Sequence, residues 1–294
     1  MSPPKPAHPV GELDPHAPVV IPTGPDGPMY PLATADILKS LPATMGVPPP
    51  GSIIANTLSD FASVDQSLVY PNGAAKEMTH VVQIAPGTFR HYMRHRGDPF
   101  ANKNSGAWFD GDRSNENNTI KHENKSRSEM SGLLKAQGKE MNIGESWEIG
   151  TTVWLDPNFI PGGGYCSLMQ CVLFQSMINL ASIEGNNVTA ELLVMPDGIG
   201  GDQVQVHQFT IPRATLTSIA VRVTLKKGGT YSISVNGGAY VTSKPMDLTK
   251  LQHKADTKIG IYTNGTMSCS YWPKHLPLND SQVVHTRIYM KLLS

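Results

Sequence analysis

The sequence predicts an all-β protein, an antiparallel sandwich or jelly roll preceded by an extended, proline-rich arm. The first observation is a series of short segments with strand-like alternation, separated by turn residues at intervals of about 8 to 12 residues. The second is the abundance of glycine and proline, 27 and 24 of 294 residues, which favours strands and turns over a helical bundle. The third is that no segment from residue 140 onward keeps the period of about 3.6 residues of an amphipathic helix.

The N-terminal 50 residues have the composition of an extended arm. They contain 14 of the 24 prolines and end in Pro48-Pro49-Pro50. Because proline fixes φ and removes an amide donor, residues 1–50 are expected to have no core of their own and to lie against the folded body or another chain. Residues 51–294 then form one domain, since β-sandwiches of up to about 250 residues fold as single units.

Seven segments carry the strand signal in the second half of the chain. They are residues 147–155, 190–195, 204–211, 219–226, 231–236, 258–262 and 283–292. The alternation on either side of Gly228-Gly229 predicts a hairpin, and Asn236-Gly237 predicts a tight turn that begins the next one.

The charge and hydropathy patterns exclude several function classes. Lys plus Arg (24) equals Asp plus Glu (24), and since phosphate affinity depends on uncompensated cations, we expect no nucleic-acid partner and no membrane partner. The most apolar stretch, residues 165–183, is interrupted by Gln170, Gln175 and Asn179, which argues against a transmembrane segment. The N-terminus lacks the apolar core of a secretory signal, so we expect synthesis in the cytoplasm without export.

The cysteines predict neither a disulfide framework nor a metal site. Cys166, Cys171 and Cys269 are odd in number and lack the spacing of zinc ligands. We therefore expect buried free thiols, no structural metal and no cofactor. Cys166 and Cys171 have opposite strand parity, which predicts side chains on opposite faces if their strand is continuous.

Three short segments far apart in the sequence have the same kind of pattern. In each of them, strand periodicity predicts one face with polar side chains. These faces hold Arg127 and Glu129 in 126–130, Gln170 and Val172 in 169–172, and Lys258, Gly260 and Tyr262 in 257–262. If the three faces belong to one sheet, an Arg, a Gln, a Lys and a Tyr converge. Such a set is suited to recognising a carboxylate beside a phenol.

The order of these segments resembles the motif series of the jelly-roll polysaccharide lyases, the group of alginate, glucuronan and heparin-like lyases. The shared elements are Arg-Ser-Glu at 127–129, a strand centred on Gln170, and Lys-x-Gly-x-Tyr at 258–262. The segment 147–155 with the prolines after it, and the terminal strand, are similar in kind, so the resemblance covers roughly residues 80–294. It implies a concanavalin-like β-jelly roll sandwich and β-elimination on a uronate-containing glycan.

The resemblance also implies roles for individual residues. Elimination requires that the uronate carboxylate be neutralised, that the C5 proton be removed and that the departing oxygen be protonated. Carried over residue by residue, Arg127 and Gln170 contact the carboxylate and Tyr262 donates the proton. Glu129 and Lys258 complete the substrate-binding set.

One position departs from the resembled pattern. Alginate lyases have a histidine base two residues after the glutamine, where this sequence has Val172. Loss of a general base costs about 10²- to 10⁴-fold in rate, although a tyrosine can serve as both base and acid in a syn geometry. His122, His207 or His253 could substitute only if the fold brings one of them beside Tyr262.

The same residues also have simpler interpretations. Arg127 and Glu129 could form a salt bridge on a sheet face, Gln170 could bond a neighbouring backbone, and Tyr262 could be a core aromatic with its hydroxyl at the rim. The basic segment 90–96 could meet an anionic glycan or an acidic partner, but we expect a solvated edge strand there.

Three functions from different classes stay open. The first is a glycan-binding, polysaccharide-lyase-like module displayed on a larger assembly, such as a phage virion decoration, fibre or tail protein, with residues 1–50 as its anchor. The second is an active polysaccharide lyase, and the third is a purely structural decoration or assembly protein. The expected partners are an acidic polysaccharide and an assembly protein, in an oligomer or a larger particle.

Overall fold

The chain divides into two compact units, Met1–Ala43 and Thr44–Ser294. The computed structural model describes residues 23–24, 27–28, 43–66, 81–93, 126–157, 159, 161, 165–172, 175–198, 201–250, 256–264 and 281–294. In the first unit, β1 (Thr23–Gly24) pairs antiparallel with β2 (Gly27–Pro28). The second unit contains two large sheets. Within the described ranges, no helix is long and apolar enough to cross a membrane.

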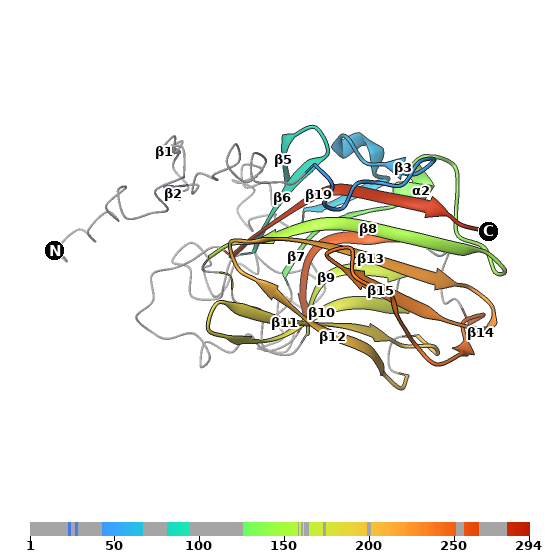
Figure 1. The fold of residues 1–294 in the computed structure, drawn as a ribbon. Coiled ribbons are helices and arrows are strands. Elements are labelled where there is room, and N and C mark those ends of the chain that lie inside the picture. The colour runs from blue at the N-terminus through green and yellow to red at the C-terminus, as the bar shows by residue number, and fades with distance from the viewer. Residues whose placement is uncertain are drawn as a thin grey trace, which may run out of the picture. The chain divides into compact units, whose positions relative to one another are not determined.

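A seven-stranded antiparallel sheet forms one layer of the second unit (Figure 1), with the strand order β12-β11-β10-β9-β18-β7-β4. Its strands are β4 (Ser63–Gln66), β7 (Ser126–Ser131), β9 (Tyr165–Val172), β10 (Ser176–Glu184), β11 (Asn187–Val194), β12 (Val204–Pro212) and β18 (Lys258–Asn264). The neighbours β7, β18 and β9 come from distant parts of the chain, as jelly-roll topology requires. This order places the three motif-bearing segments side by side.

An eight-stranded antiparallel sheet forms the other layer. Its order is β16-β15-β13-β8-β19-β6-β5, and β3 pairs with the later part of β19. Its strands are β3 (Ile53–Ile54), β5 (Val81–Ala85), β6 (Thr88–Met93), β8 (Ser146–Leu155), β13 (Leu216–Thr224), β15 (Tyr231–Val235), β16 (Val241–Thr242) and β19 (Ser281–Leu292). The smaller elements are the 3-10 helix η1 (Leu58–Asp60), the helix α2 (Leu133–Ala136), and β14 (Lys227–Gly229) paired with β17 (Met246–Asp247).

The hydrophobic core lies between the two sheets. On β8, Ile149 and Val153 belong to the core cluster and point inward, and on β18, Ile259 and Ile261 reach the same cluster from the other sheet. Each of these four side chains is fully buried. The all-β sandwich of jelly-roll type that the sequence predicts is therefore confirmed.

The predicted turns are present with one difference. Asn236 and Gly237 have φ values of 51° and 72°, and the Gly238 amide donates to the Val235 carbonyl at 3.0 Å, which is the geometry of a type I′ turn. β13 pairs with β15, as the hairpin prediction requires. The glycine segment between them, however, forms the short strand β14 and pairs with β17.

The prediction of a solvated edge strand at 90–96 is wrong for the residues that the structure describes. β6 lies between β19 and β5, and Arg90 and His91 are 7% and 0% exposed. The local sequence does not reveal that β19 pairs with β6, because β19 is contributed by residues almost 200 positions away. Residues 94–96 lie outside the described part of the chain.

Cys166 and Cys171 are free and buried, and both belong to the main core cluster. The prediction that they point to opposite faces is wrong, because β9 is not a regular strand. A register shift between Ile178 and Asn179 of β10 gives β9 one extra residue between the two cysteines and so changes their parity. Cys269 lies outside the described residues.

The chain enters the second unit on the outer face of the eight-stranded sheet. A β-carbon on Gly46 would come within 2.2 Å of Thr152 Oγ1 on β8, and Arg287 of β19 donates to the Met45 carbonyl. Thr152 alternates with the core-facing Val153, so it points away from the core. The last residues of the predicted arm, 44–50, thus belong to the compact body. Of the earlier arm residues, only Ala43, β1 and β2 are described.

Candidate functional site

The predicted site residues of β18 point away from the core. Ile259 and Ile261 belong to the core cluster, so the alternate positions Lys258 and Tyr262 face the other side of the seven-stranded sheet. This outer face is called the site face below. Two neighbouring strands, β7 and β9, contribute to it.

Cross-strand register brings three predicted residues together on the site face. Lys258 lies directly opposite Gln170 of β9, and Gly260 lies directly opposite Glu129 of β7. Gln170 Nε2 donates to Glu129 Oε1 at 3.4 Å, and Lys258 Nζ lies 3.8 Å from Glu129 Oε2. Glu129, Gln170 and Lys258 therefore form one cluster, although they come from three distant segments.

The cluster holds an anion, an amide and a cation at low exposure. The Glu129 side chain is 2% exposed and the Lys258 side chain 12%, while Gln170 is 5% exposed. A buried carboxylate needs charged or hydrogen-bonding partners, which Lys258 and Gln170 supply. Both contacts exceed the roughly 2.9 Å of a typical N–H···O bond, so each is a weak interaction. Gln170 Oε1 has no hydrogen-bond partner among the described residues.

Gly260 explains why the centre of the Lys-x-Gly-x-Tyr motif is a glycine. Its φ is +145°, and a β-carbon there would lie 2.1 Å from the Ser128 carbonyl oxygen and 2.7 Å from Glu129 Cα. Only glycine allows β18 to approach β7 this closely. The close approach fixes the position of Glu129 relative to Lys258.

Tyr262 lies two residues beyond Gly260 on the site face, directly opposite Ser167 of β9 and Arg127 of β7. It is 9% exposed and faces away from the main core cluster. Because directly paired residues of an antiparallel sheet share a face, the Cβ of Arg127 is on the site face too. The Arg127 side chain, and with it the salt bridge considered for it, lies outside the described part of the structure.

Val172 does not share a face with Gln170, contrary to the prediction from periodicity. It is fully buried in the main core cluster, because a register shift between Ser176 and Met177 makes Cys171 an extra residue of β9. Ser176 stabilises this irregularity, since its Oγ accepts a hydrogen bond from the Val172 amide at 3.1 Å. The position that holds the base in the resembled pattern therefore faces the core.

Other histidines do not approach Tyr262 in the described ranges. His207 is on β12, at the far edge of the sheet from β18, and His122 and His253 lie outside the described residues. His91 and His285 lie on the core side, fully buried, with ring centroids 5.2 Å apart and planes at 88°.

The two buried imidazoles connect the sheets. His91 Nδ1 donates to the Ser128 carbonyl at 2.7 Å, and since a carbonyl can only accept, His91 carries its proton on Nδ1. Burial lowers the pKa of His91 to about 4, with a partly opposing effect of this hydrogen bond. Burial and then His91 itself hold the pKa of His285 well below its ordinary value. Both rings are therefore neutral near pH 7, and their role is structural.

Sequence reasoning missed two residues of the site face, Asn179 on β10 and Glu191 on β11. Asn179 Nδ2 donates to Glu191 Oε1 at 2.9 Å. The available signal was the position of Asn179 as a polar interruption in an otherwise apolar run. Among the residues that the structure describes, no three His, Cys, Asp or Glu side chains are grouped to hold a metal ion.

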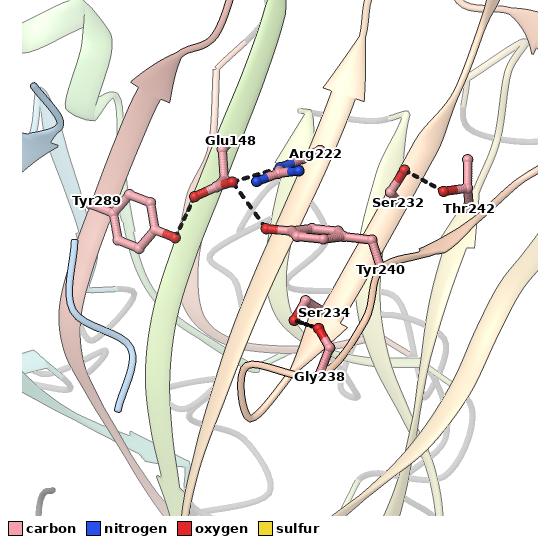
Figure 2. A network of polar contacts seen from close by, with 8 residues as sticks. All are labelled: Glu148, Arg222, Ser232, Ser234, Gly238, Tyr240, Thr242 and Tyr289. Carbon is pink, nitrogen blue, oxygen red and sulfur yellow. Dashed lines mark hydrogen bonds and ion pairs between the residues drawn. The ribbon is translucent and has the colours of Figure 1, made fainter. Parts of the chain in front are cut away.

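A second polar cluster lies on the outer face of the eight-stranded sheet (Figure 2). Glu148 of β8 accepts from Arg222 Nε at 2.7 Å, Tyr240 OH at 2.9 Å and Tyr289 OH at 2.8 Å. The Arg222 guanidinium also lies 3.9 Å from the centroid of the Tyr240 ring. The Tyr289 ring packs over Gly150 of β8, where a β-carbon would come within 2.1 Å of a ring atom.

These contacts control the protonation of the cluster. Burial would raise the pKa of the Glu148 carboxyl, but the hydrogen bonds from Arg222, Tyr289 and Tyr240 together lower it. Burial, and then the Glu148 carboxylate, raise the pKa of Tyr240 to about 12. Glu148 thus stays ionised and ties β8 to β13, to β19 and to the segment after β15. The cluster is a structural clamp on the side opposite the site face.

Comparison with known proteins gives structural matches but no sequence family. No family model matches the chain, and no curated protein matches it. Endo-β-1,4-glucuronan lyase from the fungus Trichoderma reesei is similar over 81% of this chain and 93% of that chain, with 11% identity and a TM-score of 0.49. Alginate lyase A1-II′, of polysaccharide lyase family 7, is similar over 82% and 99%, with 12% identity and a TM-score of 0.49.

A third match is of another kind. Botulinum neurotoxin type C, whose cell entry depends on two ganglioside molecules, is similar over 79% of this chain and 44% of that chain, with 11% identity and a TM-score of 0.41. Polysaccharide lyases of the group that the motifs resemble are thus among the structures similar to this chain. At such identities and TM-scores, the function has to be argued from the site itself.

Proposed function

We propose that this protein is an acidic-glycan-binding module with a polysaccharide-lyase-like jelly roll, carried on a larger assembly through residues 1–50. A phage virion decoration, fibre or tail protein is the kind of assembly that fits such an arm. The observation that carries the glycan-binding proposal is the cluster of Glu129, Gln170 and Lys258 on the site face, with Tyr262 on the same side of β18.

The chemistry of the cluster suits a uronate carboxylate. Lys258 supplies a positive charge and Gln170 an amide donor, and both are worth more in a partly desolvated site than in water. Glu129 keeps the two donors in place before a ligand arrives. Arg127, whose backbone pairs with Tyr262, would add a bidentate donor from the neighbouring strand.

Val172 favours binding over catalysis. The position of the expected histidine base is occupied by a valine that faces the core, so the described site face has no imidazole in that role. Elimination through Tyr262, acting as both base and acid, is the second candidate function, because this phenol lies on the same face as the cluster. A purely structural protein is the third candidate.

Binding and turnover are measured together to separate these functions. The full-length protein is titrated with alginate, glucuronan and heparin-like oligosaccharides by calorimetry, and ultraviolet absorbance reports any unsaturated product. We expect binding with weak or absent turnover. Arg127→Ala and Lys258→Met should each weaken binding by about 10- to 150-fold, since a hydrogen bond to a charged group contributes about 1.5 to 3 kcal/mol.

Two variants serve as controls. Lys291→Met removes a lysine from a strand of the other sheet and should leave binding unchanged. Tyr262→Phe should leave binding nearly intact and remove any residual elimination. Rapid elimination that survives Tyr262→Phe would exclude Tyr262 as the proton donor. Absence of binding to every acidic glycan would favour the structural protein.

The anchoring role of the arm has its own test. Deletion of residues 1–43 ends at the boundary of the compact body and keeps the contacts of Met45 and Gly46 with the sheet. The truncated protein should stay folded and keep its glycan affinity but sediment as a monomer, whereas the full-length protein should sediment as an oligomer or larger particle. The same number of chains per particle in the two proteins would contradict an anchoring arm.

A further inference from the structure

A row of polar side chains crosses the site face perpendicular to the strands. Tyr262 of β18 is opposite Ser167 of β9, Ser167 is opposite Asn179 of β10, and Asn179 is opposite Glu191 of β11. The next residue in register is Gln208 of β12. Directly paired residues share a face, so all five side chains project from the site face.

Contacts within the row fix its middle. Asn179 Oδ1 accepts a hydrogen bond from the Cys166 amide at 3.0 Å, and Asn179 Nδ2 donates to Glu191 Oε1 at 2.9 Å. Cys166 precedes Ser167, the residue of β9 that is paired with Asn179. Glu191 is therefore oriented by a buried amide and keeps one carboxylate oxygen for another donor.

The row becomes more exposed toward β12. Ser167 and Asn179 are buried, Glu191 is partly exposed, and Gln208 is exposed. Strands are about 4.8 Å apart, so Tyr262 and Glu191 are separated by roughly 14 Å, a length that accommodates a few pyranose units. A linear glycan lying along the row would therefore meet Tyr262 and Glu191 with different sugars. Arg127 of β7 is opposite Tyr262 and extends the row on that side, whereas Lys258 lies four residues, roughly 13 Å, from Tyr262 along β18.

In the strands β7, β18, β9, β10, β11 and β12, lysine and arginine occur at one end of the row only, together with the Glu129 carboxylate. Strands β9, β10, β11 and β12 contain no lysine and no arginine. The cations of the central strands are Arg127 on β7 and Lys258 on β18. A carboxylate on the ligand is favoured at the β7 and β18 end, whereas over β11 it would meet the carboxylate of Glu191 without a compensating cation on those strands.

Resting on the proposed function, we infer that the bound glycan carries its uronate over β18 and a sugar without a carboxylate over β10 and β11. The ligand class is a polymer in which uronates alternate with uncharged sugars, not a homopolymer of uronates. Glu191 is the specificity-determining residue: its carboxylate accepts a hydrogen bond from a sugar hydroxyl and repels a second uronate.

The test compares two acidic glycans on the full-length protein. The probes are hyaluronan oligosaccharides, in which glucuronate alternates with N-acetylglucosamine, and glucuronan oligosaccharides of equal length. We expect the alternating polymer to bind at least about 10-fold more tightly at low ionic strength, where charge repulsion is least screened. Glu191→Gln, which keeps an acceptor for Asn179, should raise the affinity for glucuronan about 10-fold and leave that for hyaluronan nearly unchanged.

A matched control removes the same charge elsewhere. Glu184→Gln acts on an exposed carboxylate at the end of β10 and should change neither affinity. Equal binding of the two polymers, or no response of glucuronan binding to Glu191→Gln, overturns the inference and leaves the proposed function standing. Absence of binding to both polymers overturns the inference, and absence of binding to every acidic glycan overturns the proposed function as well.

Discussion

Replacing His91 with Gln is expected to weaken the dependence of stability on pH. Burial lowers the pKa of His91 to about 4 in the folded chain, whereas an unfolded histidine titrates near its ordinary value of 6.5. Between these values the unfolded chain binds a proton that the folded chain does not, so stability falls as the pH falls from about 6.5 to about 4. The loss over the whole window is about 3 kcal/mol, and about 2 kcal/mol of it has occurred at about pH 5.

Other buried groups add to the wild-type profile. His285 acts in the same direction as His91, because its pKa is also lowered. Asp256 acts in the opposite direction: burial raises the pKa of its carboxyl to about 6, so the folded chain takes up that proton first as the pH falls. The cluster of Glu129 and Lys258 lies on the site face, whereas His91 lies on the core side of the same sheet. Because these other groups are present in both proteins, the informative quantity is the difference between wild type and His91→Gln in the loss of stability.

The assay is urea unfolding followed by tryptophan fluorescence at about pH 8 and about pH 5. The loss of unfolding free energy between the two pH values should be about 2 kcal/mol larger for the wild type than for His91→Gln. The cost of burying an amide in the core is the same at both pH values and cancels. His207→Gln, at a partly exposed position on β12, should retain the wild-type difference. Parallel profiles for wild type and His91→Gln would refute the assignment of a buried, neutral His91.

Three other predictions concern stability and thiols. Gly260→Ala should destabilise the protein by about 3 kcal/mol or more in thermal melts, since backbone strain and overpacking each cost about 1 to 3 kcal/mol. Gly237→Ala, with open space around its β-carbon, should cost only the strain, and equal costs for the two variants would contradict the close approach at Gly260. Glu148→Gln should cost about 1.5 to 3 kcal/mol by weakening a carboxylate that accepts from three donors, and an unchanged melting temperature would exclude the clamp. Cys166 and Cys171 should react with a thiol reagent only after denaturation, when all three cysteines of the unreduced chain should titrate; a single reactive thiol would indicate a disulfide.

Much of the fold could be predicted from local patterns. Strand alternation at 147–155 and 258–262 corresponds to β8 and β18, and Asn236-Gly237 forms the expected tight turn. Period-2 alternation also assigned Glu129, Lys258 and Gln170 each to the polar face of its own strand, and in the structure these three faces form one side of the sheet. Strand alternation and turn dipeptides depend on residues close in sequence, which is why sequence reasoning could reach them. That the three faces lie on one sheet depends on the strand order, which local patterns do not give.

The errors have a common cause in long-range pairing. Val172 turns toward the core because β9 has an extra residue stabilised by Ser176, and no simple periodicity anticipates such a shift. Arg90 is buried because β19 closes one side of β6. Glu148 and Tyr289 are 141 residues apart, so their hydrogen bond could not be inferred from spacing. Asn179 and Glu191 needed the strand order before they could be seen as one row.

The contacts of Met45 and Gly46 separate the first residues of the second unit from the strands that form the site face. Met45 and Gly46 contact Arg287 and Thr152 on β19 and β8. The strands of the site face, β7, β9 and β18, belong to the other sheet. A substitution that loosens the contacts of Met45 and Gly46 therefore acts on the eight-stranded sheet and leaves the strand pairing around Glu129, Gln170 and Lys258 in place.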